Sequence, residues 1–128
     1  MKCKQFKNLL FNLDDKTFTI ESGSVGTYSY IDIVLCEIVY EKSKYKNKTP
    51  LFSKKAREES LGQITWLSNY VFTGLRFVMK NGMVYYVYIS DEGSPWKSLK
   101  NHEDTASANE ILKFVNKIIN KYRKKRTD

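Results

Sequence analysis

The histidine and carboxylate residues are the first place to look for catalytic chemistry in this 128-residue chain. His102 is the only histidine, and Glu103 and Asp104 follow it directly in a polar stretch. An imidazole beside carboxylates is typical of a general base or of a metal ligand. The alternative is a solvated histidine in a surface loop, and the polar surroundings favour that interpretation.

The remaining residues with catalytic potential do not form a recognisable motif. Four pairs of adjacent acidic residues occur, and two of them could meet in space as a general acid and base: 14–15, 58–59, 91–92 and 103–104. Their positions in expected turns and helix ends favour solvated charges instead. Cys3 and Cys36 lack the CxxC spacing of a zinc site, and no P-loop, GxGxxG or GxSxG string is present. We therefore expect no enzyme activity, no cofactor and no bound metal.

The positive charge of the chain is concentrated in two clusters. The net charge is +8, and residues 111–128 alone carry seven basic groups against one acid. The other cluster lies between residues 42 and 57, where seven basic groups occur without an acid and two aromatic residues are interleaved. The candidate residues for binding a polyanion or a partner are Lys42, Lys44, Lys46, Lys48, Lys54, Lys55, Arg57, Lys113, Lys117 and Lys124. The alternative for both clusters is an ordinary solvated surface, so the sequence leaves open whether they share one face.

Most of the chain before residue 90 shows the period-two alternation that is typical of strands. Residues 6–21 predict a hairpin that turns at residues 14–16, and residues 28–41 predict a long strand. The alternation in this strand is interrupted, because Asp32 shares the parity of Val34. We expect a bulge or bend near residues 30–33. Residues 53–61 predict a short helix, and residues 63–72 predict one or two strands.

A second hairpin is predicted over residues 75–90, because the pair Asn81-Gly82 is typical of a two-residue type I′ turn. That turn would place six side chains on one face, which we expect to belong to the core: Leu75, Phe77, Met79, Val84, Tyr86 and Tyr88. Tyr85 would lie on the opposite face. Since Tyr85 and Tyr88 cannot then both be core residues, one of them is a candidate for a contact surface.

The C-terminal part of the chain predicts one amphipathic helix after a polar loop at residues 91–105. Ser107 and Glu110 have the spacing of a capping box, which indicates the start of the helix. Four apolar side chains then share a narrow arc that we expect to dock on the strands: Ile111, Val115, Ile118 and Tyr122. Lysines occupy the opposite side.

These elements predict an α+β fold in a single domain over residues 1–128. Antiparallel strands form a partly open barrel or two packed sheets, closed by the C-terminal amphipathic helix. The expected folded core covers residues 6–122, and residues 123–128 form a basic tail. No run of apolar residues is long enough for an integral membrane segment or a signal-peptide core, and the two cysteines suit a reducing cytoplasm.

The chain resembles bacterial pleckstrin-homology-like (PH-like) domains in its strand order and closing helix. Three strings carry the resemblance: residues 17–21, residues 28–33 and the Asn-Gly hairpin before the helix. The resemblance implies two roughly orthogonal sheets with the helix plugging one end, and a binding or scaffolding role rather than an enzymatic one. Some members bind phosphoinositides through a basic pocket between the first strands, but the turn at residues 14–16 is here acidic on balance.

We therefore expect a small, non-enzymatic binding or scaffolding module in the cytoplasm, with a protein as its partner. The alternative is a peripheral binder of polyanions, meaning an anionic membrane surface or a nucleic acid. The sequence predicts neither the identity of the partner nor the oligomeric state.

Overall fold

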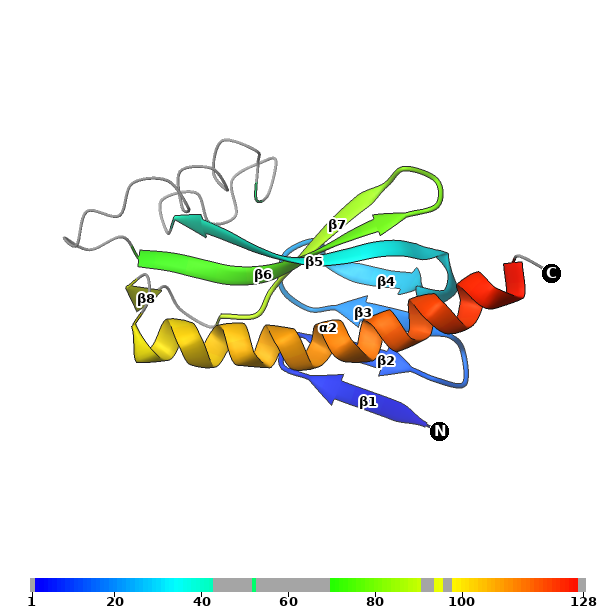
Figure 1. The fold of residues 1–128 in the computed structure, drawn as a ribbon, viewed down its shortest axis with the longest axis horizontal. Coiled ribbons are helices and arrows are strands. Elements are labelled where there is room, and N and C mark those ends of the chain that lie inside the picture. The colour runs from blue at the N-terminus through cyan, green and yellow to red at the C-terminus, as the bar shows by residue number, and fades with distance from the viewer. Residues whose placement is uncertain (1, 43–51, 53–69, 91–93, 96–97, 127–128) are drawn as a thin grey trace.

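Two antiparallel sheets and one long helix, α2, make up the part of the chain that the computed structural model describes (Figure 1). The described residues are 2–42, 52, 70–90, 94–95 and 98–126. The strands form two separate packed sheets, and α2 contacts strands along most of its length. The α+β class is thus confirmed in its two-sheet form, without a closed barrel among the described strands.

Sheet A contains the first four strands in the order β1-β2-β3-β4. Their bounds are Cys3–Phe6 for β1, Leu9–Asn12 for β2, Thr17–Ile20 for β3 and Gly26–Ser29 for β4. The predicted hairpin over residues 6–21 is confirmed, because β2 and β3 pair around the turn at residues 13–16. Alternate residues of these two strands point into the core between the layers, as the period-two pattern requires.

The chain leaves sheet A through a single 3₁₀ turn, η1, at Tyr30–Asp32 and enters sheet B as β5, Ile33–Lys42. The pairing register of β5 shifts between Ile33 and Leu35, which marks an irregularity in the strand. The bend predicted near residues 30–33 is therefore confirmed. It has a clear role, since it allows one continuous segment to serve both sheets.

Sheet B has the order β5-β6-β7, with β6 at Tyr70–Met79 and β7 at Val84–Tyr88. A short strand β8, Ser94–Pro95, pairs with the beginning of β6. The predicted hairpin exists, but its predicted register is wrong by one residue, because Phe77 pairs with Tyr85 rather than with Tyr86.

The cause of the register difference is the length of the turn. The Met79 amide N–H donates to the carbonyl of Met83, and the Gly82 N–H donates back to the carbonyl of Met79, which closes a loop of three residues. Only Gly82 has a positive φ, at 87°, as expected where a type I turn is followed by one left-handed residue. One extra loop residue exchanges the two faces of β7.

The correction changes which hairpin side chains form the main core. Leu75, Phe77 and Met79 of β6 lie in the core as expected, but their β7 neighbours there are Val87 and the half-buried Tyr85. The other predicted core residues of β7 point to the outer face of sheet B: Val84, Tyr86 and Tyr88.

A second, smaller apolar cluster covers part of this outer face. Phe52 is fully buried, and its ring lies 4.9 Å from the ring of Tyr88 and 5.4 Å from that of Tyr86, centroid to centroid. Gly74 makes room for it, since a Cβ there would lie 2.5 Å from Phe52 Cζ and from the Val87 carbonyl oxygen. Glu41 is also fully buried, and its carboxylate accepts hydrogen bonds from the Phe52 amide and the Tyr88 hydroxyl.

Helix α2 spans Leu99–Arg126 and begins eight residues before the predicted capping box, so the predicted start at Ser107 is wrong. Ser98 caps it instead, because its Oγ accepts a hydrogen bond of 3.2 Å from the Asn101 amide. The early turns do not look amphipathic because their buried positions are polar. Asp104 is fully buried and accepts a hydrogen bond from Ser90 Oγ, with Lys7 and Lys100 within 4 Å of its carboxylate.

The apolar side of α2 covers the space between the two sheets. Its buried residues recur at helical spacing: Ala108, Ile111, Val115 and Ile119. Docking through Ile111 and Val115 is as predicted, whereas Ile119 rather than Ile118 occupies the next buried position. Ile118 and Tyr122 pack at the margin of the core. None of the described helices is long and apolar enough to cross a membrane.

Candidate functional site

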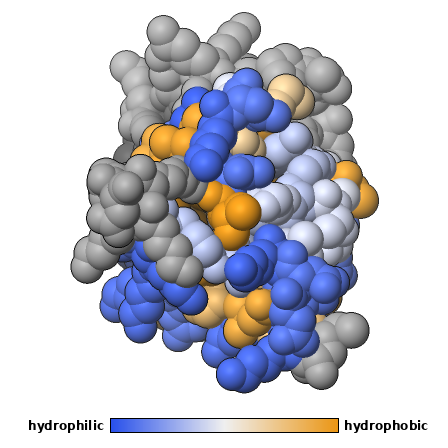
Figure 2. Space-filling model, turned by 90° about the vertical axis from the view of Figure 1, so that its right-hand side faces the viewer, coloured by the Kyte–Doolittle hydropathy of each residue, from blue (hydrophilic) through white to orange (hydrophobic). Residues whose placement is uncertain are grey.

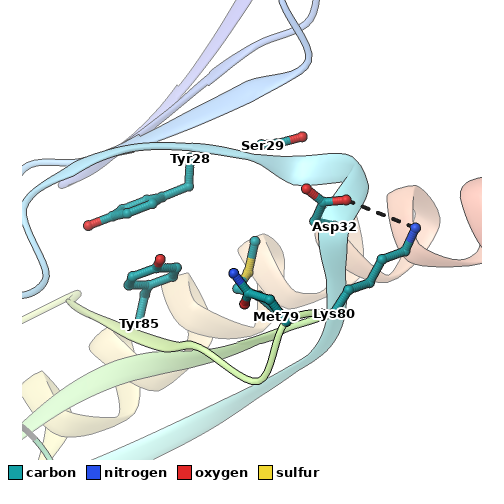
Figure 3. Close-up of a pocket in the computed structure, with 7 residues that line it drawn as sticks. Tyr28, Ser29, Asp32, Met79, Lys80 and Tyr85 are labelled. Atoms are coloured by element: carbon teal, nitrogen blue, oxygen red, sulfur yellow. Dashed lines mark ion pairs between the residues drawn. The ribbon is translucent and has the colours of Figure 1, made fainter.

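A surface pocket lies where the two sheets diverge, between the β4–η1 corner and the β6–β7 turn (Figure 3). Its volume is about 300 Å³, which suits one or two side chains of a bound partner. Seven residues line it: Tyr28, Ser29, Asp32, Met79, Lys80, Asn81 and Tyr85. They come from the last strand of sheet A, from η1 and from the end of the sheet B hairpin, so the pocket exists only when both sheets are in place.

Two stacked tyrosines form the aromatic wall of the pocket. The ring centroids of Tyr28 and Tyr85 are 3.9 Å apart, with an angle of 24° between the ring planes. The ring of Phe18 packs against Tyr28, with 5.6 Å between the two ring centroids. The Tyr28 hydroxyl donates a hydrogen bond of 3.0 Å to the carbonyl of Ser24. Burial raises the pKa of the Tyr28 phenol above its ordinary value, and the neighbouring Tyr85 adds to the rise. Tyr28 therefore stays a neutral hydrogen-bonding group at physiological pH.

An ion pair forms the polar rim opposite the tyrosines. Lys80 Nζ lies 4.0 Å from the Asp32 carboxylate, and both side chains are about half exposed. The backbone reinforces this link, because the Lys80 amide donates to the Asp32 carbonyl at 2.9 Å. An exposed pair of this kind adds little to stability and leaves both charges accessible to a ligand. Met79 supplies a buried apolar floor beneath them.

The side-chain arrangement of the pocket is suited to binding. It offers a flat aromatic surface, a thioether and one acid–base pair, which together match an apolar or aromatic group beside a polar or charged one. Figure 2 shows the end of the molecule that carries these turns, where hydrophobic surface emerges between hydrophilic rims. The described residues hold no cluster of three or more His, Cys, Asp or Glu side chains that could bind a metal ion.

The histidine region has a different structure from the expected loop. His102 is the fourth residue of α2 and its side chain is exposed, whereas the neighbouring Asp104 is fully buried among Ser90 and two lysines. The two side chains point to different environments, so the structure does not bring them together as an acid–base pair.

The candidate basic residues are only partly described. Lys113 and Lys117 are exposed on the solvent side of α2, as expected. Lys42 ends β5 and Lys124 lies in the last turns of α2, but their side chains are outside the described part of the structure. Outside the described residues lie Lys44, Lys46, Lys48, Lys54, Lys55 and Arg57. Whether the two clusters share a face therefore stays a prediction, as do the short helix at 53–61 and the strands expected before Tyr70.

Sequence reasoning did not find the pocket, although two of its signals were visible. Asp32 stood out as a polar residue that interrupts the alternation of a strand, and Tyr85 was one of two tyrosines proposed for a contact surface. Tyr88 proved to be the buried member of that pair. The missing information was tertiary, since nothing local shows that η1 and the β6–β7 turn lie at the same end of the sheets.

Comparisons with models of protein families, with curated proteins and with solved structures gave no match to this chain.

Proposed function

We propose that this chain is a small, non-enzymatic binding or scaffolding module of the PH-like kind, and that it holds a protein partner in the pocket between η1 and the β6–β7 turn. The single observation that carries the proposal is the stacked pair Tyr28–Tyr85 on an open pocket wall. Two free cysteines, one exposed and one buried, agree with action in the cytoplasm.

The chemistry of the pocket supports a protein ligand. Tyrosine is enriched at the centres of protein interfaces, where its ring supplies contact area at a small cost in side-chain entropy. Tyr28 and Tyr85 are already fixed by stacking, so a partner need not order them further. Asp32 and Lys80 beside them provide the polar groups that give orientation and specificity.

Affinity capture at two salt concentrations tests the proposal. The full chain serves as bait at about 50 mM and about 300 mM salt, which changes the screening length of exposed charges about twofold. We expect a partner that is retained at both concentrations by the wild type and lost by the Tyr85→Ala variant. Tyr70→Ala is the matched control, because Tyr70 is exposed and lies at the far end of β6. Retention by Tyr85→Ala equal to that of the wild type would contradict the proposal.

A second variant covers the case in which Tyr85→Ala weakens the fold. Lys80→Glu places two acidic groups at the rim of the pocket without altering a buried side chain. It should release the partner while the melting temperature stays close to that of the wild type. The alternative function, electrostatic binding of polyanions, predicts a different result: capture falls steeply with salt and follows the number of lysines instead of Tyr85.

A further inference from the structure

The open edge of β1 and the side of α2 next to it form a second surface that the pocket does not involve. Among the described strands, β1 pairs only with β2, so its other edge is open. The Leu13 amide donates to the Lys2 carbonyl, which makes Lys2 a hydrogen-bonded position of the ladder. By antiparallel alternation, the N–H and C=O groups of Cys3 and Gln5 then point outward, toward the open edge.

Contacts between aromatic rings place this edge beside α2. Phe6 at the end of β1 lies 5.5 Å from Phe114 of α2, centroid to centroid. Figure 1 shows that β1 and α2 run in opposite directions, so the start of β1 and the end of α2 lie at the same end of the molecule. Lys4 shares the face of Phe6, and its Nζ is 5.4 Å from the Phe6 ring.

Lysines from both elements line this edge. Lys4 lies about 7 Å from Phe6 along β1, in the direction of the N-terminus. The fourth residue after Phe114 lies about 6 Å farther along α2, toward the same end of the molecule. Lys4 is therefore level with the segment between Lys117 and Lys121, which lie one turn apart on that side of α2. All three lysines are exposed, and none of them forms an ion pair with another described residue. Glu110 is the acidic residue on the same side of α2, one turn before Phe114.

We infer that this surface, the open edge of β1 with Lys4, Lys117 and Lys121, binds an acidic and extended segment of a partner protein that adds to sheet A as a further strand. The inference rests on the proposed function as a protein-binding module. Outward backbone N–H and C=O groups match another peptide backbone, and the lysines select acidic side chains on alternate residues. A nucleic acid or a lipid headgroup would use the lysines but would offer no matching ladder to β1.

Fluorescence anisotropy with the full chain and a labelled synthetic peptide tests the inference. The probe is a peptide of about eight residues that alternates Glu and Thr, long enough for one added strand. Two further probes of equal charge carry N-methyl groups, one on all Glu residues and the other on all Thr residues. We expect the first peptide to bind, one methylated peptide to lose at least about tenfold in affinity and the other to keep it, because only one alternate set of N–H groups faces β1.

Single lysine variants test the charge contribution. Lys4→Gln, Lys117→Gln and Lys121→Gln should each weaken binding about two- to fivefold at low salt. Lys113→Gln is the control, because Lys113 lies two turns before Lys121 and farther than Lys117 from the level of Lys4 along α2. It should change the affinity less than about twofold.

Two results would overturn strand addition at this edge. One is equal affinity of both methylated peptides, and the other is binding of heparin or anionic vesicles without binding of the peptide. If the acidic peptide fails while Tyr85-dependent capture of a partner persists, the inference fails and the proposed function stands. If the peptide binds but Tyr85→Ala still captures the partner, strand addition at β1 is supported and binding of the partner in the pocket is contradicted.

Discussion

The phenol hydroxyl of Tyr88 donates a hydrogen bond to the carboxylate of Glu41 on the outer face of sheet B, where both side chains are fully buried. The Phe52 amide donates to the second oxygen of the same carboxylate at 3.1 Å. A buried carboxylate needs such donors, because in an apolar site it has exchanged water for protein partners. The pair therefore holds β5, β7 and Phe52 together.

Removing the Tyr88 hydroxyl should destabilise the protein without changing its packing. Tyr88→Phe leaves one oxygen of Glu41 without this donor, and we expect a loss of about 1–3 kcal/mol in the free energy of unfolding. Urea denaturation measures the loss. Tyr70→Phe removes the same atom from an exposed ring and should cost less than about 0.5 kcal/mol. Equal effects of the two changes would show that the Glu41 contact does not contribute.

Replacing either of two glycines with alanine should destabilise the protein, and the physical reason differs between the two positions. Gly82→Ala meets no atom within 4 Å but must adopt a positive φ, which costs about 1 kcal/mol. Gly74→Ala would force its Cβ against Phe52 and the Val87 carbonyl and should cost about 1–3 kcal/mol, the range of an overpacked core. Thermal unfolding of both variants gives the comparison. A Gly74→Ala protein as stable as the wild type would mean that Phe52 does not cover the sheet.

Truncations on α2 should follow burial around the helix. Ile111→Ala removes a fully buried side chain from between the sheets and should cost about 2–5 kcal/mol. Ile118→Ala should cost less, because Ile118 lies at the margin of the core, and Lys117→Ala should change stability by less than about 0.5 kcal/mol. Similar values for all three in chemical denaturation would contradict docking through the Ile111 side.

The two thiols should differ sharply in reactivity. Burial raises the pKa of the Cys36 thiol well above its usual value, and Glu37 adds to the rise, so little thiolate forms in the folded protein. Cys3 is exposed in β1. At pH near 8, a thiol reagent should modify one cysteine in the folded protein and the second only on unfolding. Rapid modification of both would contradict the burial of Cys36.

The raised pKa of the Cys36 thiol should also make the stability of the folded protein depend on pH in the alkaline range. The neutral Cys36 thiol is favoured in the folded state, so its contribution is complete below the unfolded-state pKa of 9.0 and is lost as the pH rises above it. The free energy of unfolding of the wild type should fall more steeply above pH 9.0 than that of Cys36→Ala. Parallel curves for the two proteins would exclude this contribution.

The strands of the fold were predictable where one face is buried and the other is solvated. The hairpin around residues 13–16 shows this alternation, and the bend at residues 30–33 was predictable because the alternation is interrupted there. The start of α2 was not predictable from periodicity, because its first buried positions, Asn101 and Asp104, are polar and take their partners from the tertiary structure. The register of the second hairpin depended on one loop residue, Lys80, which local sequence does not assign to strand or turn.

The pocket as a whole could not be predicted from local patterns. Tyr28 and Tyr85 stack only because η1 directs β5 into the second sheet and brings the β6–β7 turn opposite β4. The alternation of the hairpin, with the register expected for a two-residue turn, assigned Tyr85 to the wrong face. An error of one residue in a turn therefore hid the aromatic wall of the candidate site.

Nuclear magnetic resonance of the tyrosine rings tests the central claim most directly. The full chain carries ring-labelled tyrosine, and the salt-resistant partner from affinity capture is added stepwise. We predict that the ring signals of Tyr28 and Tyr85 shift or broaden as the partner fills the pocket, while the signal of exposed Tyr70 stays in place. Unchanged Tyr28 and Tyr85 signals at saturating partner would contradict the account.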